Sequence, residues 1–227
     1  MNTIAIVVLI LLLVVVAIYM LIGYTSSANK NVSLLSVPSV IETKDIVNPT
    51  AVNYTYSFWL NVSSWSNTET KPIITFSESS SSTNPNFTIY LDPTDSNLYC
   101  DILTFTQVKR ILITSTLPLQ TWVHVVVSVE NDNVDCYLNG KMTNAVILPS
   151  PQQQVASTSS PTITIGSNKG FNAAVQRIVR APYSVDPYTI WLDYWTNYTF
   201  VSSTGVNWNL KVALLKNKQV SYETTFI

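Results

Sequence analysis

Residues 1–23 contain one uninterrupted apolar run, Ile4–Ile22, with no charged residue, proline or glycine. As an α-helix, its 19 residues would extend roughly 28 Å, close to the ~30 Å hydrocarbon core of a bilayer. We therefore expect a transmembrane anchor, with Ile4, Leu12 and Ile22 at its start, middle and end.

A cleaved signal peptide is the alternative interpretation of this run. Ser26-Ser27-Ala28 offers small residues of the kind found at cleavage sites. However, the apolar run is longer than the roughly 7–15 residues usual in signal peptides, and no Lys or Arg precedes it. These features favour a retained anchor and a single-pass membrane protein. Lys30 is the only basic residue near either end of the run, so the orientation in the membrane stays open.

The pattern changes twice after the anchor. Residues 24–52 are polar without a clear period and include Pro38 and Pro49, which predicts a tether or an extended arm. From residue 53, apolar positions alternate with largely polar ones, which predicts a half-buried strand. The apolar positions of this strand are Tyr54, Tyr56, Phe58, Leu60 and Val62.

Seven more short apolar runs follow, separated by turn-rich stretches. They are Pro72–Phe76, Phe87–Leu91, Leu98–Phe105, Val108–Ile113, Trp122–Val129, Val134–Leu138 and Thr162–Ile165. Asn139-Gly140 is a strong signal for a tight turn, because both residues tolerate positive φ. Many short strands with little helical period predict an antiparallel β-sandwich.

Composition narrows the range of partners. Charged residues make up 11% of the chain and the formal net charge is −1. Such a chain lacks the basic surface that binds nucleic acid through phosphate contacts. A near-neutral surface suits a protein that packs against other macromolecules.

Five blocks of sequence follow one another in a recognisable order: an opening strand, a Trp-x-His-Val strand, a hairpin ending in an Asn-Gly turn, the next strand, and a closing strand with a short helix. These blocks are Tyr56–Leu60, Trp122–Val127, Val134–Lys141, Ile163–Gly166 and Phe171–Trp195. They resemble the concanavalin A-like lectin/glucanase superfamily, in its laminin-G-like branch. The resemblance implies an all-β, two-sheet antiparallel jelly-roll sandwich, here expected over residues 53–195 and preceded by one transmembrane helix.

The catalytic motif of the superfamily is missing from this chain. Its glucanases carry Glu-x-Asp-x-x-Glu on one strand, because glycoside hydrolysis needs two carboxylates at a fixed separation. None of the five glutamates here forms that spacing. His124 is the only histidine and, with Ser128, forms a candidate dyad, but its place inside a valine run favours a packed strand residue. We therefore expect no enzymatic activity.

Metal ligands are sparse. Many members of the superfamily bind Ca²⁺ through loop carboxylates and carbonyls. The candidates here are Asp92 and Asp95 in one loop, and Asp132 and Asp135 around a turn. Asp is also a routine turn residue, and a lone histidine cannot form a His-rich zinc site. We expect neither a metal nor a cofactor.

Cys100 and Cys136 are the two cysteines. A disulfide is the alternative if the domain is extracellular or lumenal. Cys136 shares its parity with Val134 and Leu138, which favours two buried thiols. The residues expected in the structural core are Phe58, Trp122, His124, Cys136 and Leu138.

Residues 196–227 follow the region of resemblance. Val206–Leu214 alternates apolar and polar positions, which predicts an amphipathic strand. This strand either covers the domain's own sheet or docks on a partner. In the second case Trp208 and Leu210 are the expected contact residues.

Aromatic side chains mark a second expected contact region, at Trp59 and Trp65. Such residues stack on sugar rings and also dominate protein interfaces. An anchor, a tether, one sandwich and a strand-like tail favour a non-enzymatic structural or interaction protein, whose partners are a lipid bilayer and other structural proteins.

Membrane-anchored proteins with this kind of domain resemble minor capsid components of large icosahedral DNA viruses that have an internal membrane. That resemblance implies a location in the internal membrane of the virion and a role in linking this membrane to the capsid shell. The alternative is a carbohydrate-binding lectin or adhesin on a cell-surface membrane.

Overall fold

The computed structural model describes residues 33–65, 69–79, 84–167, 171–202, 210–216 and 219–226. Two six-stranded sheets contain most of its strands. Sheet A consists of β1 (Ser33–Leu34), β12 (Phe171–Ala181), β3 (Tyr54–Trp65), β8 (Trp122–Glu130), β9 (Asn133–Leu138) and β10 (Lys141–Ile147), in that order. Sheet B consists of β2 (Ser39–Ile41), β11 (Thr162–Ile165), β4 (Lys71–Ser77), β5 (Phe87–Leu91), β6 (Leu98–Leu103) and β7 (Val108–Thr114).

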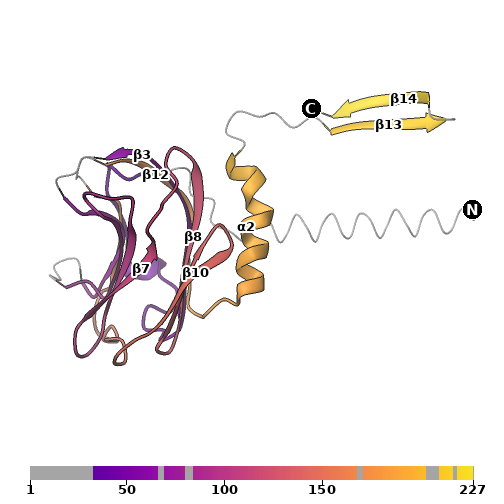
Figure 1. The fold of residues 1–227 in the computed structure, drawn as a ribbon. Helices are drawn as coiled ribbons and strands as arrows, with labels where there is room; N and C mark the ends of the chain where they lie inside the picture. Colours follow the sequence, from indigo (N-terminus) through magenta and orange to yellow (C-terminus); the bar gives the residue numbers. More distant parts are fainter. Residues whose placement is uncertain are drawn as a thin grey trace, which may run out of the picture.

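All neighbouring strands in both sheets are antiparallel, and the two sheets pack face to face around one apolar core (Figure 1). The all-β, two-sheet sandwich predicted from the sequence is confirmed. The five alternating apolar residues of β3 all lie in this core. The expected tight turn is also present, with positive φ at Asn139 and Gly140 between β9 and β10.

The segment that precedes β3 is part of the sandwich. β1 pairs with β12, and β2 pairs with β11, so this arm adds one short strand to an edge of each sheet. The side chains of Leu35 and Ile46 are buried in the core. A Cβ at Gly166 would lie 2.6 Å from the Leu35 carbonyl oxygen, so the arm fits only against a glycine there.

From Ser33 onwards, residues 24–52 form the extended arm and not a free tether. The physical reason is that two isolated apolar side chains, Leu35 and Ile46, fill the open edge of the core without producing any periodicity in the sequence. Between them, the 3-10 helix η1 (Thr43–Asp45) is tied to the sandwich by a hydrogen bond from the Thr43 hydroxyl to the Pro161 carbonyl.

Helix α2 (Pro187–Ser202) lies against the outer face of sheet A, beside β8 and β10 (Figure 1). Asp186 caps its first turn: the carboxylate accepts hydrogen bonds from the amides of Tyr188 and Thr189 and from the Thr189 hydroxyl. The helix extends past Trp195, where the sequence had placed the end of the domain. Within the described ranges, no helix is both long enough and apolar enough to cross a membrane. The expected anchor, Ile4–Ile22, lies outside the described residues.

The C-terminal segment contains two strands, where the sequence had predicted one. β13 (Leu210–Lys216) pairs with β14 (Gln219–Phe226) as an antiparallel hairpin. Val206 and Trp208 lie outside the described residues. Because β13 satisfies its backbone hydrogen bonds with β14, the strand has a partner within the C-terminal segment itself.

Candidate functional site

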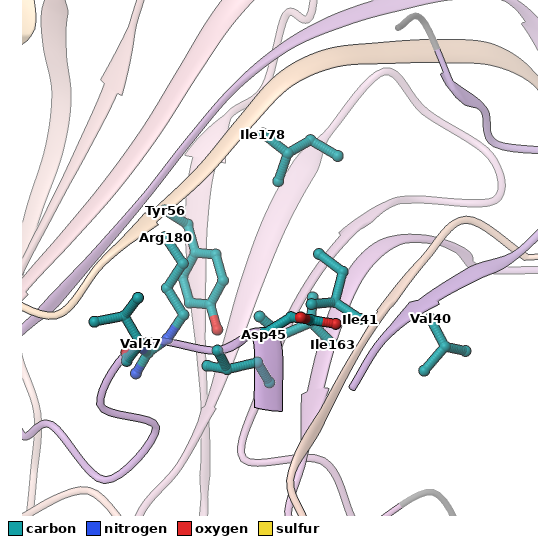
Figure 2. Close-up of a pocket in the computed structure, with 9 residues that line it drawn as sticks. Val40, Ile41, Asp45, Val47, Tyr56, Ile163, Ile178 and Arg180 are labelled. Atoms are coloured by element: carbon teal, nitrogen blue, oxygen red, sulfur yellow. The ribbon is translucent and has the colours of Figure 1, made fainter. Parts of the chain in front are cut away.

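A pocket of about 480 Å³ opens at the edge of the sandwich, where the arm passes between the two sheets (Figure 2). Its walls are mostly aliphatic, with three polar side chains among them. It is lined by Val40, Ile41, Asp45, Ile46, Val47, Tyr56, Ile163, Ile178 and Arg180. Its size and apolar character are typical of pockets that receive a small ligand or a protruding side chain.

An irregularity in β12 shapes one wall of this pocket. Gln176 pairs with Trp59 and Val179 pairs with Ser57, so two residues of β12 oppose the single residue between Trp59 and Ser57 on β3. Such a bulge reverses which side chains face inward. As a result Ile178 packs against the core, whereas Val179 is exposed.

Because the bulge reverses which positions of β12 face inward, the Arg180 side chain extends toward the arm. Its Nη1 donates hydrogen bonds to the carbonyl oxygens of Val47 at 2.9 Å and Asn48 at 3.3 Å. The guanidinium also lies 5.6 Å from the ring centroid of Tyr54 and 5.4 Å from that of Phe76. Hydrogen bonds and cation–π contacts of this kind fix the arm to the sandwich.

The polar groups of the pocket are poorly placed for chemistry. Tyr56 Oη is covered and has no hydrogen-bond partner among the described residues. Burial raises the pKa of the Tyr56 phenol well above its usual value, and the nearby Arg180 guanidinium offsets part of this rise. Asp45 is the only acidic residue in the lining and is exposed. The pocket can therefore receive an apolar group, while Arg180 holds the arm through its hydrogen bonds to the Val47 and Asn48 carbonyls.

The sequence analysis placed Tyr56 and Ile163 on strands but identified none of the pocket-lining residues as a binding residue. If the alternation continued from Val175, the side chain of residue 177 would face inward. Because of the bulge, the side chains of Ile178 and Arg180 face inward instead. Arg177 adopts φ +53, a left-handed conformation that nothing in its local sequence announces.

His124 lies beneath α2 on the outer face of sheet A. Its Nε2 is 2.9 Å from Ser57 Oγ and 3.3 Å from Asp193 Oδ2, and its Nδ1 has no partner among the described residues. In a Ser-His-Asp triad, the serine and the carboxylate contact opposite ring nitrogens. The candidate dyad with Ser128 is wrong, because the Ser128 hydroxyl contacts Thr55 and Val185 instead.

Two expectations about tryptophans need correction. Trp59, expected at an interaction surface, is buried under α2 and stacks on Tyr194 at 5.8 Å between ring centroids. Trp122, expected in the core, is only partly buried where β8 begins. The side chains of Trp65 and Leu210 lie outside the described part of the chain.

The remaining expected core residues lie at the inner faces of the strands. Phe58 and Cys136 are fully buried in the core, and Leu138 packs against it while partly exposed. Cys100 and Cys136 are free thiols on opposite sheets. Burial raises the pKa of the Cys136 thiol to about 12, and it also raises that of Cys100. Both thiols are therefore unreactive while the domain is folded.

The acidic loop predicted as a candidate calcium site forms a local turn. Asp92 Oδ1 accepts hydrogen bonds from the amides of Thr94 and Asp95 and from the Thr94 hydroxyl. These hydrogen bonds lower the pKa of the Asp92 carboxyl. Within the described ranges, no group of three or more His, Cys, Asp or Glu side chains is arranged to hold a metal ion.

The architecture and its family profile agree. Two six-stranded antiparallel sheets around one apolar core define a jelly-roll sandwich of the concanavalin A type. The profile of the Concanavalin A-like lectin/glucanases superfamily matches residues 37–178, more than half of the chain. The chain belongs to this superfamily, and the match begins within the arm.

Solved structures with a similar fold include binding domains of botulinum neurotoxins. The domain of neurotoxin DC in complex with rat synaptotagmin II has a TM-score of 0.56 and 17% identity, covering 74% of this chain and 45% of that one. The DC domain in complex with SialylT has a TM-score of 0.58 and 16% identity, covering 74% of this chain and 45% of that one. The serotype G domain has a TM-score of 0.53 and 13% identity, covering 76% of this chain and 48% of that one.

These similarities establish the fold alone. The chain spans less than half the length of each of these three neurotoxin domains. No curated protein matched the sequence.

Proposed function

We propose that this chain is a non-enzymatic interaction protein, anchored in a membrane by Ile4–Ile22, that binds another protein at the edge pocket of its sandwich. The observation that supports this proposal most directly is the aliphatic pocket together with its rim. Val40 and Val47 line the pocket and are also 50% and 68% exposed. An open apolar pocket with an apolar rim fits a protruding side chain of a partner protein, as the central anchors of protein interfaces do.

The pocket fits a protein better than a sugar. Sugar sites combine an exposed aromatic platform with several free polar groups. Here Tyr56 is the only aromatic residue in the lining, and it is buried. The Arg180 guanidinium already donates hydrogen bonds to the backbone of the arm.

A carbohydrate-binding role is the second candidate, supported by the ligands bound in the similar structures. The binding domain of neurotoxin DC was solved once with SialylT and once with a protein, rat synaptotagmin II. Both ligands belong to that domain, and the fold is compatible with either class of partner.

In its narrower form, the proposal takes the protein partner to be a capsid shell and the membrane to be the internal membrane of a virion. The support for this form is the expected anchor followed by a single sandwich. Mass spectrometry of purified virions tests it: the chain should be recovered with the membrane fraction after the outer shell is removed, and recovery only with host surface membranes would contradict it.

A matched pair of valines tests the pocket itself. Val40 on β2 and Val108 on β7 are 50% and 51% exposed at the two opposite edges of sheet B. A photo-crosslinking amino acid at Val40 in the full chain should give a discrete protein adduct in the native assembly, and the same group at Val108 should not.

Charge substitution provides the complementary measurement. Val40→Asp should abolish the adduct formed by a crosslinker at Val47, whereas Val108→Asp should leave it intact, because only the first places a charge at the pocket rim. Equal melting temperatures for the two variants would show that folding is unaffected. Binding to a glycan array that survives Val40→Asp, with no protein adduct, would favour the carbohydrate alternative.

A further inference from the structure

Helix α2 has two apolar faces, and only one is used inside the domain. The inner face consists of Ile190, Tyr194 and Asn197, spaced as successive turns of a helix are. Ile190 is 2% exposed and packs with Val126. Tyr194 stacks on Trp59.

The outer face of α2 carries a ladder of aromatic rings. Tyr188 stacks near Trp191 at 6.3 Å, and Trp191 stacks on Trp195 at 6.2 Å with an interplanar angle of 7°. All three rings are exposed, and Trp195 is 62% accessible. Leu192 extends the same exposed surface, whereas the partly exposed ring of Tyr198 packs beside Tyr194 and Trp59.

The ladder is nearly free of charge. The segment Pro187–Ser202 contains no Lys or Arg, and Asp193 is its only ionisable acid. Asp193 accepts a hydrogen bond from Asn197 Nδ2 at 2.6 Å and lies 3.3 Å from His124, so its carboxylate is directed toward the inner face. The carboxylate of Asp186, which precedes the helix, accepts a hydrogen bond from the Thr189 amide and caps the first turn.

We infer that the outer face of α2 lies in the interfacial layer of the bilayer that holds the N-terminal anchor. This inference rests on the anchor in the proposed function. Tryptophan and tyrosine favour the headgroup region, where the ring is partly apolar and its polar atom stays hydrated. Helices that bind in this layer bury an apolar face carrying residues such as Trp, Phe and Leu at the boundary between headgroups and acyl chains.

The length of chain between the anchor and the sandwich limits how far sheet A can lie from the membrane. Eleven residue steps separate Ile22 from Ser33, which limits their distance to about 40 Å even for a fully extended chain. Ser33 pairs with Val175 in β12, and β12 ends at Ala181, six residues before α2 begins. The chain that follows the anchor therefore enters sheet A first, and this is the sheet that carries α2 on its outer face.

The outer face of α2 is already formed before it meets the membrane, which favours binding to lipid. The inner face fixes α2 on the sandwich, so little conformational entropy is lost when the outer face meets lipid. The edge pocket belongs to the arm between the sheets, so α2 can contact lipid while the pocket stays available to a protein.

Quenching by brominated lipid tests the inference on the full chain. The protein is reconstituted in phosphatidylcholine vesicles, with and without lipid brominated near the headgroup, and tryptophan fluorescence is recorded after flotation. Trp191→Phe/Trp195→Phe keeps an aromatic face but removes two of the six tryptophans. The control Trp122→Phe removes one from β8.

Most of the quenching should disappear in the double variant and persist in Trp122→Phe. Vesicles that float with the protein but show equal quenching in all three forms would overturn the α2 inference and leave the anchor standing. In that case, protection of Trp191 and Trp195 from aqueous acrylamide would assign the face to a protein or to a second copy of the chain. Failure to float would instead overturn the anchor.

Discussion

The ring of Tyr194 stacks on the indole of Trp59, with centroids 5.8 Å apart and an interplanar angle of 20°. Tyr194 comes from α2 and Trp59 from the outward side of β3. This contact gives sheet A a second, smaller core on its outer face, completed by Val126, Tyr137 and Ile190. The helix is therefore an integral layer of the domain.

Because of this second core, replacing Trp59 should destabilise the domain more than replacing Trp122. Trp59→Ala should lower the free energy of unfolding by about 3–5 kcal/mol, as large aromatic truncations in cores do. Trp122→Ala should cost less, because Trp122 is only partly buried. Urea denaturation of both variants in the same detergent tests this order. Equal losses would show that α2 does not cover Trp59.

Arg180 should control the attachment of the arm. Arg180→Leu removes the hydrogen bonds to the Val47 and Asn48 carbonyls and the cation–π contacts. We expect a loss of about 1–3 kcal/mol, since charged hydrogen bonds are lost from a partly buried site. Hydrogen–deuterium exchange should accelerate selectively over residues 39–49.

Arg177 on the same strand provides the control for this experiment. Arg177→Gly leaves the contacts of the arm intact and relieves the left-handed backbone at φ +53. This variant should preserve the slow exchange of the arm. Equal acceleration in both variants would assign the effect to β12 as a whole.

Alkaline pH should destabilise the domain. Burial raises the pKa of Cys136 to about 12 and raises those of Cys100 and Tyr54. The unfolded state releases these protons at lower pH than the folded state. Stability from these groups is thus fully present below about pH 9 and is lost as the pH rises toward 12. Melting temperatures across pH 7–11 measure this fall, and a flat profile would contradict it.

The same burial predicts slow thiol chemistry. A maleimide reagent at pH 8 should label Cys100 and Cys136 only as fast as the domain unfolds, and immediately in denaturant. Rapid labelling of the native protein would contradict the buried positions. A Cys100–Cys136 crosslink in the purified protein would contradict the free thiols.

Asp186 should determine the order of the first turn of α2. Its hydrogen bonds with Thr189 and Tyr188 lower the pKa of the carboxyl, so the cap is present above the usual aspartate pKa and weakens only as the pH falls through a lower value. Asp186→Ala should lower the melting temperature, whereas Asp186→Asn should retain most of the cap. Identical melting temperatures for all three forms would remove this role.

The sequence predicted the strands of the two sheets well, but it did not predict how the arm and the pocket form at the edge of the sandwich. Alternation in β3 placed Phe58 and its neighbours correctly, because one face of that strand meets the core. The same alternation made Trp59 look exposed, since periodicity does not reveal a helix more than a hundred residues later that covers the outer face.

The pocket depends on features with no periodic signal. The bulge at Arg177 reverses the parity of β12, and single apolar residues such as Leu35 and Ile46 attach the arm. Each is a tertiary contact between distant segments, so the local pattern on which the sequence analysis relied does not contain it.

The two short strands of the arm also determine how the domain would respond to tension. A pull on the chain before Ser33 loads β1 first, which is two residues long, and then β2, which is three. β3 resists next, because it is paired on both sides along most of its length. Once detached, residues 33–53 would span up to roughly 70 Å when fully extended, while β3 and the strands beside it stay paired. The arm would then act as an extensible spacer that absorbs mechanical load between the chain before Ser33 and the rest of the sandwich.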